Sequence, residues 1–212
     1  MRASPRPIPT NQKKSLGGHR LPNQIFAIRE LRMYDSSMHL KPQDVVVLIK
    51  LLEYGSKRPP YAQVAKELFM SASEVHASVQ RGKCACLLIG PERLETPNKS
   101  ALEEFLIHGL KYAFPPQRGE LTRGVPTAFA SEPLKSRISA GNGPPPVWPY
   151  AEGKSRGYSF APLYKTVPQA ALADSFLYEM LALIDAIRDG RTRERQIAIE
   201  ELKIRLRSSH HA

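Results

Sequence analysis

The feature that most constrains the fold is an apolar run, VVVLIKLL, at residues 45–52. Pro42 precedes it, where proline suits the first turn of a helix, and Gly55 follows it, where glycine favours the helix end. We therefore predict a helix from Pro42 to Glu53. Because apolar residues occur on nearly every side of this helix, other elements of the chain must bury it.

Two further helices are predicted to provide that cover. The first has four residues at helical spacing on one face, namely Tyr61, Val64, Ala65 and Leu68. The second begins with a capping box, Ser71 with Glu74 three residues later, and is predicted to run from Ala72 to Arg81. Val75 and Val79 should face inward from it, which leaves a polar face of small side chains on the other side.

The segment Cys84–Ile89 is predicted to be a strand, followed by a Gly90–Pro91 turn and a return strand at Arg93–Thr96. On a strand the two cysteines would share one buried or half-buried face. Their CxC spacing is too tight for an easy disulfide, so a reducing, cytoplasmic setting is expected. A zinc site would need two more ligands, such as His76 or His108, and redox sensing is a minor alternative, so we predict neither a metal nor a cofactor.

Three helices, a three-residue turn before the third, and a two-stranded ribbon follow the order of a winged helix-turn-helix. In that fold the third helix enters the major groove of DNA, and its polar side chains reach base edges and phosphates. The predicted fold class is mainly α with a small β-wing, completed by a Pro-rich connection and C-terminal helices. The candidate DNA-binding residues are Ser71, Ser73, His76, Ala77, Gln80, Arg81, Lys83 and Arg93.

The runs LKPQDVVVLIKLL and YAQVAKELFMSASEVHASV resemble bacterial MarR-like winged-helix transcriptional regulators. The later runs FLIHGLKYAFPPQRGELTRGVPTAFA and PPPVWPYAEGKSRGYSFAPLY suggest a small family with a fixed C-terminal extension. The resemblance covers about residues 39–207. It implies sequence-specific DNA binding with autoregulation, and it implies no ligand.

Three departures from that pattern affect the DNA-binding part. Phe69 and Cys86 stand where such proteins usually have glycine, and a bulky residue at a position that requires positive φ is costly. Ala77 and Gln80 stand where the third helix often carries Arg or Lys. These departures bear on affinity more than on fold.

Charge is distributed unevenly along the 212 residues, whose 31 Lys and Arg against 20 Asp and Glu give +11. Residues 1–38 carry +5 and are predicted to be a basic, disordered arm, or in part an overextended start before Met33 or Met38. Residues 39–112 form the predicted winged helix-turn-helix domain with its following helix, of which residues 39–110 carry only +1. The excess indicates a polyanionic partner whose binding depends strongly on salt.

Residues 113–168 are rich in proline and glycine and are predicted to be an extended connection. Arg118 and Arg123 lie there in an expected basic loop, which would hold phosphate or simply be solvated. Trp148 is predicted to be a packing anchor rather than a base-stacking platform.

Residues 169–207 are predicted to form two helices, Gln169–Asp189 and Arg191–Arg207, that pack within the chain or pair two copies. An amphipathic helix, Lys99–Tyr112, is expected between the wing and the connection.

No catalytic motif is evident, and the longest apolar runs reach only five residues, far short of the roughly 20 of a membrane span. There is also no secretory signal pattern. We predict a non-enzymatic, cytoplasmic regulator that binds double-stranded DNA as a homodimer and does not associate with membranes. The alternative is an antitoxin-like protein that binds a partner encoded nearby, with DNA binding secondary. An enzyme with its site in residues 112–168 is a weaker alternative, since that stretch has no His and no Cys.

Overall fold

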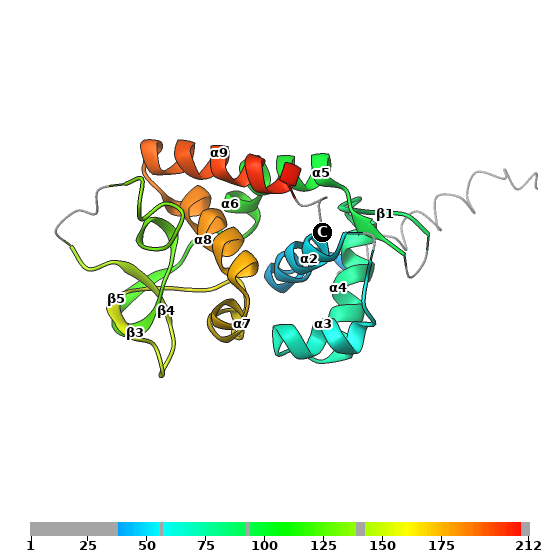
Figure 1. The fold of residues 1–212 in the computed structure, drawn as a ribbon, viewed down its shortest axis with the longest axis horizontal. Coiled ribbons are helices and arrows are strands. Elements are labelled where there is room, and N and C mark those ends of the chain that lie inside the picture. Colours follow the sequence, from blue (N-terminus) through cyan, green and yellow to red (C-terminus); the bar gives the residue numbers. More distant parts are fainter. Residues whose placement is uncertain (1–37, 56, 92–93, 139–142, 209–212) are drawn as a thin grey trace, which may run out of the picture. The chain divides into compact units, whose positions relative to one another are not determined.

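The central element is α2 (Pro42–Tyr54), which confirms the helix predicted from the apolar run. The computed structural model describes residues 38–55, 57–91, 94–138 and 143–208 (Figure 1). Residues 45–49, with Leu51 and Leu52, are almost fully buried, as an all-round apolar helix requires. Gly55 ends the helix at φ 56°, a backbone conformation that glycine adopts without strain.

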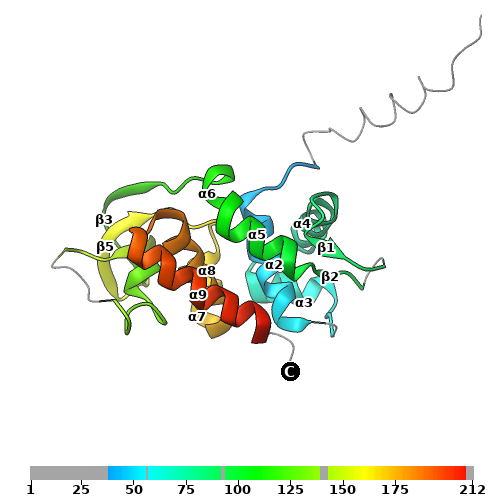
Figure 2. The same cartoon turned by 90° about the horizontal axis from the view of Figure 1, so that it is seen from above.

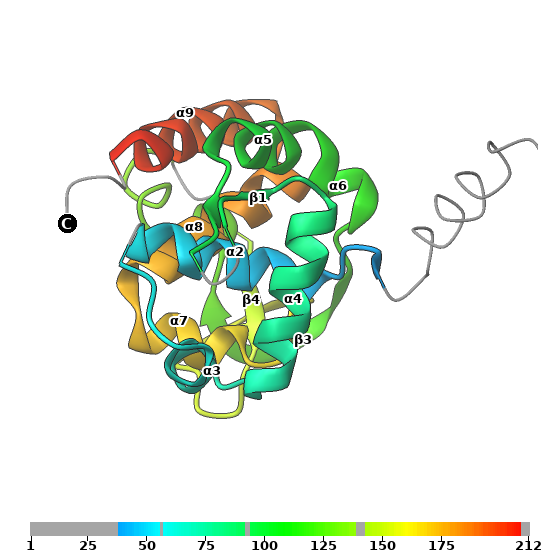
Figure 3. The same ribbon diagram turned by 90° about the vertical axis from the view of Figure 1, so that its right-hand side faces the viewer.

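Two helices and a short hairpin follow. Helix α3 (Tyr61–Leu68) buries Val64, Ala65 and Leu68, and α4 (Ala72–Cys84) buries Val75 and Val79, as predicted. Both helices pack on α2, and Figure 3 shows α4 beside it. The strands β1 (Leu88–Ile89) and β2 (Thr96–Pro97) pair antiparallel.

The predicted strand Cys84–Ile89 is wrong over most of its length. Helix α4 continues to Cys84, and the N–H of Ala85 still donates to the carbonyl of Arg81 at 2.9 Å. Leu88 and Ile89, in β1, are the part of the predicted strand that the structure confirms. A short apolar run has no periodicity of its own, so it does not show where a helix ends and a strand begins. The return strand is likewise shorter than predicted, and Arg93 lies outside the described residues.

The helix predicted at Lys99–Tyr112 is present and consists of three successive segments, a π-helical one between two α-helical ones. It begins as α5 (Lys99–Glu104), widens to the π-helical η3 (Phe105–Gly109) and ends as α6 (Leu110–Ala113). Leu102, Leu106 and Leu110 are buried, so its apolar face packs on the core.

The predicted extended connection is a small sheet, which makes the fold mixed α/β. The strands are β3 (Arg118–Pro126), β4 (Pro146–Pro149) and β5 (Ser155–Phe160), with a short 3-10 turn, η4 (Ala128–Ala130), after β3. Strand β3 pairs antiparallel with both others, and β4 pairs parallel with β5, so each strand contacts the other two. The basic loop expected around Arg118 and Arg123 is therefore strand β3.

Trp148 anchors this sheet to the helices, as predicted for a packing residue. Its indole N–H donates to Asp185 on α8 (Ser175–Asp189) at 2.7 Å, and Thr127 donates to the same carboxylate at 2.9 Å. Arg188 pairs with Asp185 at 2.8 Å. A buried carboxylate is retained here because three donors replace its lost water.

The C-terminal part contains three helices rather than two: α7 (Val167–Ala173), α8 (Ser175–Asp189) and α9 (Thr192–Ser208). Asp174 interrupts the predicted first helix, because its side chain accepts the N–H of Leu177 and caps α8. The residues from Met180 to Arg188 on α8 are buried inside the chain, so the apolar stripe of this helix packs within one copy. Helix α9 packs on α8 and α5 (Figure 2).

Buried or half-buried charges join these layers. Lys50 on α2 contacts Glu53 at 2.6 Å, Glu67 of α3 at 3.0 Å and Asp174 at 2.6 Å. Burial opposes its charge, but hydrogen bonds to these carboxylates outweigh it and raise the pKa of Lys50 above its ordinary value.

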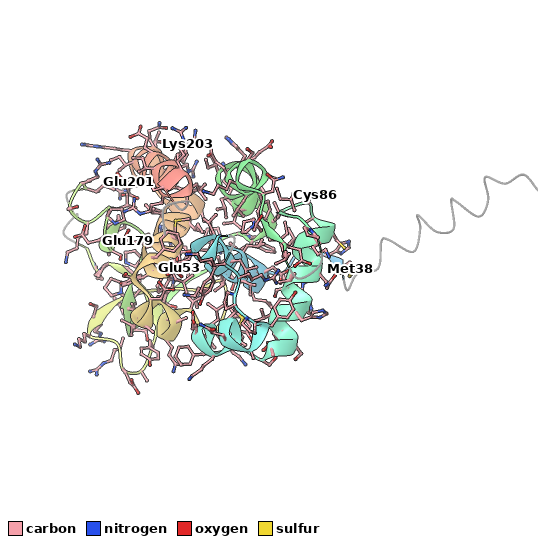
Figure 4. All side chains as sticks on the ribbon, turned by 45° about the vertical axis from the view of Figure 1, so that its right-hand side comes forward. Met38, Glu53, Cys86, Glu179, Glu201 and Lys203 are labelled. Atoms are coloured by element: carbon pink, nitrogen blue, oxygen red, sulfur yellow. The ribbon has the colours of Figure 1, made fainter. Side chains whose placement is uncertain are left out.

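A second such charge lies between the last two helices. Arg205 on α9 pairs with Glu179 of α8 at 2.8 Å and with Glu201 at 2.5 Å, and Figure 4 labels these two carboxylates.

Candidate nucleic-acid interface

The turn between α3 and α4 has the backbone that the predicted pattern requires. Phe69 lies in the left-handed region at φ 54°, where glycine is usual, and its side chain remains 42% exposed. The N–H of Met70 donates to the carbonyl of Ala65 at 2.9 Å and closes the end of α3. A non-glycine residue in this conformation costs about 1–2 kcal/mol, so the turn is strained.

The predicted capping box at the start of α4 is confirmed. The N–H of Glu74 donates to the Ser71 hydroxyl at 3.2 Å, and the N–H of Ser71 donates to the Glu74 carboxylate at 2.9 Å. Tyr164 also donates to Glu74, at 2.5 Å. These bonds, that of Tyr164 first, lower the pKa of Glu74 to about 2.

Tyr164 and Thr166 hold the turn from the far part of the chain, and sequence reasoning missed both. The hydroxyl of Thr166 donates to the carbonyl of Leu68 at 2.8 Å. Because these residues lie more than 90 positions after the turn, no local pattern connects them with it. The start of α4 is therefore fixed from two sides.

Five of the predicted contact residues lie on the accessible side of α4. Ser71, Ser73 and His76 are exposed, while Ala77 and Gln80 are half-buried. Residues 73, 76, 77 and 80 follow helical spacing and therefore share one face. The imidazole of His76 packs edge-on against Tyr61 at a centroid distance of 5.5 Å, which steadies it without covering the face.

Arg81 does not belong to this face, which corrects the prediction. Its side chain is 6% exposed, and its guanidinium donates to both oxygens of Asp44, at 2.7 and 2.6 Å. Asp44 is itself fully buried at the start of α2. A fork-shaped guanidinium matched to a buried carboxylate is a structural ion pair, so Arg81 holds α4 against α2.

Lys83 is half-buried and points to the hairpin, where it contacts Glu95 at 3.0 Å. Arg58 pairs with the same buried carboxylate. The hairpin is thus attached to α2–α4 by two cations that share one buried carboxylate. The charge of Lys83 is already engaged in this network, although a half-buried lysine can still reach solvent.

The cysteines are not where the strand prediction placed them. Cys84 ends α4 and is exposed. Cys86, labelled in Figure 4, is also exposed and has φ 58°. Cys86, like Phe69, thus adopts a left-handed conformation that glycine takes without strain. In the part of the chain that the structure describes, no group of three His, Cys, Asp or Glu side chains is arranged to hold a metal.

Comparison with protein-family models, with curated proteins and with solved structures found no match for this chain. Among the helices of the described residues, none is long and apolar enough to cross a membrane.

Proposed function

We propose that the protein is a sequence-specific transcriptional regulator that binds double-stranded DNA through a winged helix-turn-helix. In this proposal α4 is the recognition helix, α2 and α3 support it, and the β1–β2 hairpin is the wing. The observation that carries the proposal is the exposed face of α4 with Ser73, His76, Ala77 and Gln80, on a helix fixed at its capped start and at its core side.

The chemistry of this face suits base edges. Gln80 is able to form a bidentate hydrogen-bond pair with adenine, and Ser73 and His76 offer further donors and acceptors. The methyl group of Ala77 would contact a thymine methyl group. Small side chains also let the helix backbone approach the groove closely.

Affinity in this proposal comes largely from outside the reading helix. Apart from the half-buried Lys83, which is paired with Glu95, the accessible side of α4 has no Arg or Lys, whereas residues 1–38 carry +5 and residues 111–212 carry another +5. Neutralising phosphates with such segments makes binding fall steeply as salt rises. A nearly neutral recognition helix would then supply the discrimination between sequences.

Selection from a randomised duplex library with the full-length protein at low salt tests the proposal. The enriched duplex is then titrated by fluorescence anisotropy against the wild type and Gln80→Ala. We expect Gln80→Ala to weaken binding to that duplex about tenfold, the loss of one bidentate contact. It should leave binding to an unselected duplex unchanged.

Gln196→Ala is the matched control, since Gln196 is an exposed glutamine on α9. It should bind like the wild type. Failure to enrich any sequence with a folded protein, or equal losses in both variants, would refute the proposal.

A further inference from the structure

Strands β3 and β5 place like charges directly opposite each other. In their antiparallel register Arg123 pairs with Arg156, and both side chains are exposed. Lys154, also exposed, stands just before β5. Like charges in directly opposed positions destabilise a sheet, so this pair does not serve the stability of the fold and suggests a role in binding.

These cations surround a hollow of about 670 Å³. Among its lining residues, Arg123, Lys154 and Arg156 are basic, and Glu152 is the one carboxylate. The Tyr150 hydroxyl donates to Glu152 at 3.3 Å. No salt bridge engages the three cations within the described residues, and one carboxylate faces them, so the hollow carries an excess of positive charge. Such a concave surface attracts phosphate groups.

An aromatic and an aliphatic side chain lie beside the charges. Leu121 and Tyr158 face each other across β3 and β5, two positions from the arginine pair, so all four side chains share one face of the sheet. They are 45% and 47% exposed, respectively. An exposed tyrosine ring next to phosphate-binding cations is the combination that stacks an unpaired base while its backbone is held.

The backbone beneath this face is tightly packed. A Cβ added at Gly157 would overlap the carbonyl oxygen of Pro145, and one at Gly153 would overlap the backbone of Gly124. The side chains of the face therefore project from closely packed strands. Such a rigid backbone favours fixed positions of the charged groups relative to one another.

We propose that the β3–β5 face is a second nucleic-acid site that binds a single strand. Phosphates lie against Arg123, Lys154 and Arg156, and a base stacks on Tyr158. In Figures 1 and 2 the sheet lies beyond α8 from α4, so a strand held on it would not occupy the surface of α4. The site goes beyond duplex recognition and does not depend on it.

The test is anisotropy titration of full-length protein with a fluorescein-labelled oligothymidylate of about 20 nucleotides over a salt series. The variant Arg123→Gln/Arg156→Gln should weaken binding about tenfold at low salt and reduce the slope of log affinity against log salt by about 1.4. Arg193→Gln/Arg207→Gln removes the same charge from exposed positions of α9 and should change affinity less than about twofold.

A third variant separates a single strand from polyanions in general. Tyr158→Leu keeps an exposed apolar side chain and removes the aromatic ring, so it should weaken oligothymidylate binding about fivefold or more. Gln80→Ala should leave oligothymidylate binding unchanged, which separates this site from α4. Equal losses in the two double variants would overturn the proposal, and so would wild-type binding by Tyr158→Leu.

Discussion

Replacing Arg81 by methionine should destabilise the protein rather than merely weaken DNA contacts. Arg81 donates two hydrogen bonds to Asp44, which is 0% exposed, and a third to Ser78 at 3.2 Å. Without Arg81, Asp44 would retain the N–H of Lys41, at 2.8 Å, as its hydrogen-bond donor. A buried carboxylate left without its counter-ion costs about 3–5 kcal/mol, so we expect a loss of that size for Arg81→Met.

The double variant Asp44→Leu/Arg81→Met tests whether the loss of stability comes from the unpaired Asp44 carboxylate. It removes both charges and should recover most of the lost stability, apart from about 1 kcal/mol for the lost cap at Lys41. Urea unfolding followed by far-ultraviolet circular dichroism measures both values, and Trp148 fluorescence provides a second probe in the sheet. A loss below about 1 kcal/mol for Arg81→Met, or a double variant as unstable as the single one, would refute a structural ion pair.

Three further changes test other parts of the account. Cys86→Gly removes the strain of a side chain at positive φ and should stabilise the folded protein by about 0.5–1 kcal/mol. Cys84→Gly, the same change inside α4, should not stabilise the protein, and thermal melting distinguishes the two variants. Glu74 has its pKa lowered from 4.5 to about 2 in the folded protein, so its stabilisation is complete above about pH 4.5 and is lost as the pH falls toward 2. Glu74→Gln should therefore be about 1 kcal/mol less stable than wild type at pH 7 and equally stable near pH 2 by urea titration, with a pH-independent difference counting against this. Gly157→Ala should lose more than about 2 kcal/mol in the same assay, because its Cβ would overlap Pro145, and a change under about 0.5 kcal/mol would contradict that packing.

The part of the fold that local patterns encode was predictable. The run at residues 45–52, the spacing of Val64, Ala65 and Leu68, and the Ser71–Glu74 capping box each determine a helix through neighbours within a few positions. The strain at Phe69 was also predictable, because the turn between these helices requires positive φ whatever residue occupies it. For Cys86 the resemblance indicated positive φ, whereas the predicted strand did not.

The sheet was not predictable in the same way. Strand β4 has four residues, two of them prolines, and it pairs with residues more than 20 positions before it. Such pairing depends on partners distant in sequence, which no local periodicity records. Arg123 lies opposite Arg156 because of the register between β3 and β5. The face that they form was therefore equally unpredictable from the sequence.

The candidate site was predictable in its position but not in each of its members. Helical spacing correctly put Ser73, His76 and Gln80 on the accessible side of α4. The same spacing did not predict that Arg81 is buried. A long charged side chain is expected at the surface unless the carboxylate that pairs with it is known. That partner, Asp44, lies 37 residues earlier.

The most direct test of the central claim uses the exposed Cys84 at the end of α4. An iron chelate is attached to Cys84 in full-length Cys86→Ser protein, and cleavage of the selected duplex is mapped. The matched protein carries the chelate at Ser136→Cys, an exposed position after η4, with both native cysteines replaced by serine. If α4 lies on DNA, the Cys84 chelate will cleave at one focused position and the Ser136→Cys chelate will not. Cleavage from position 136 alone, or equal unfocused cleavage from both, would contradict the assignment of α4 as the recognition helix.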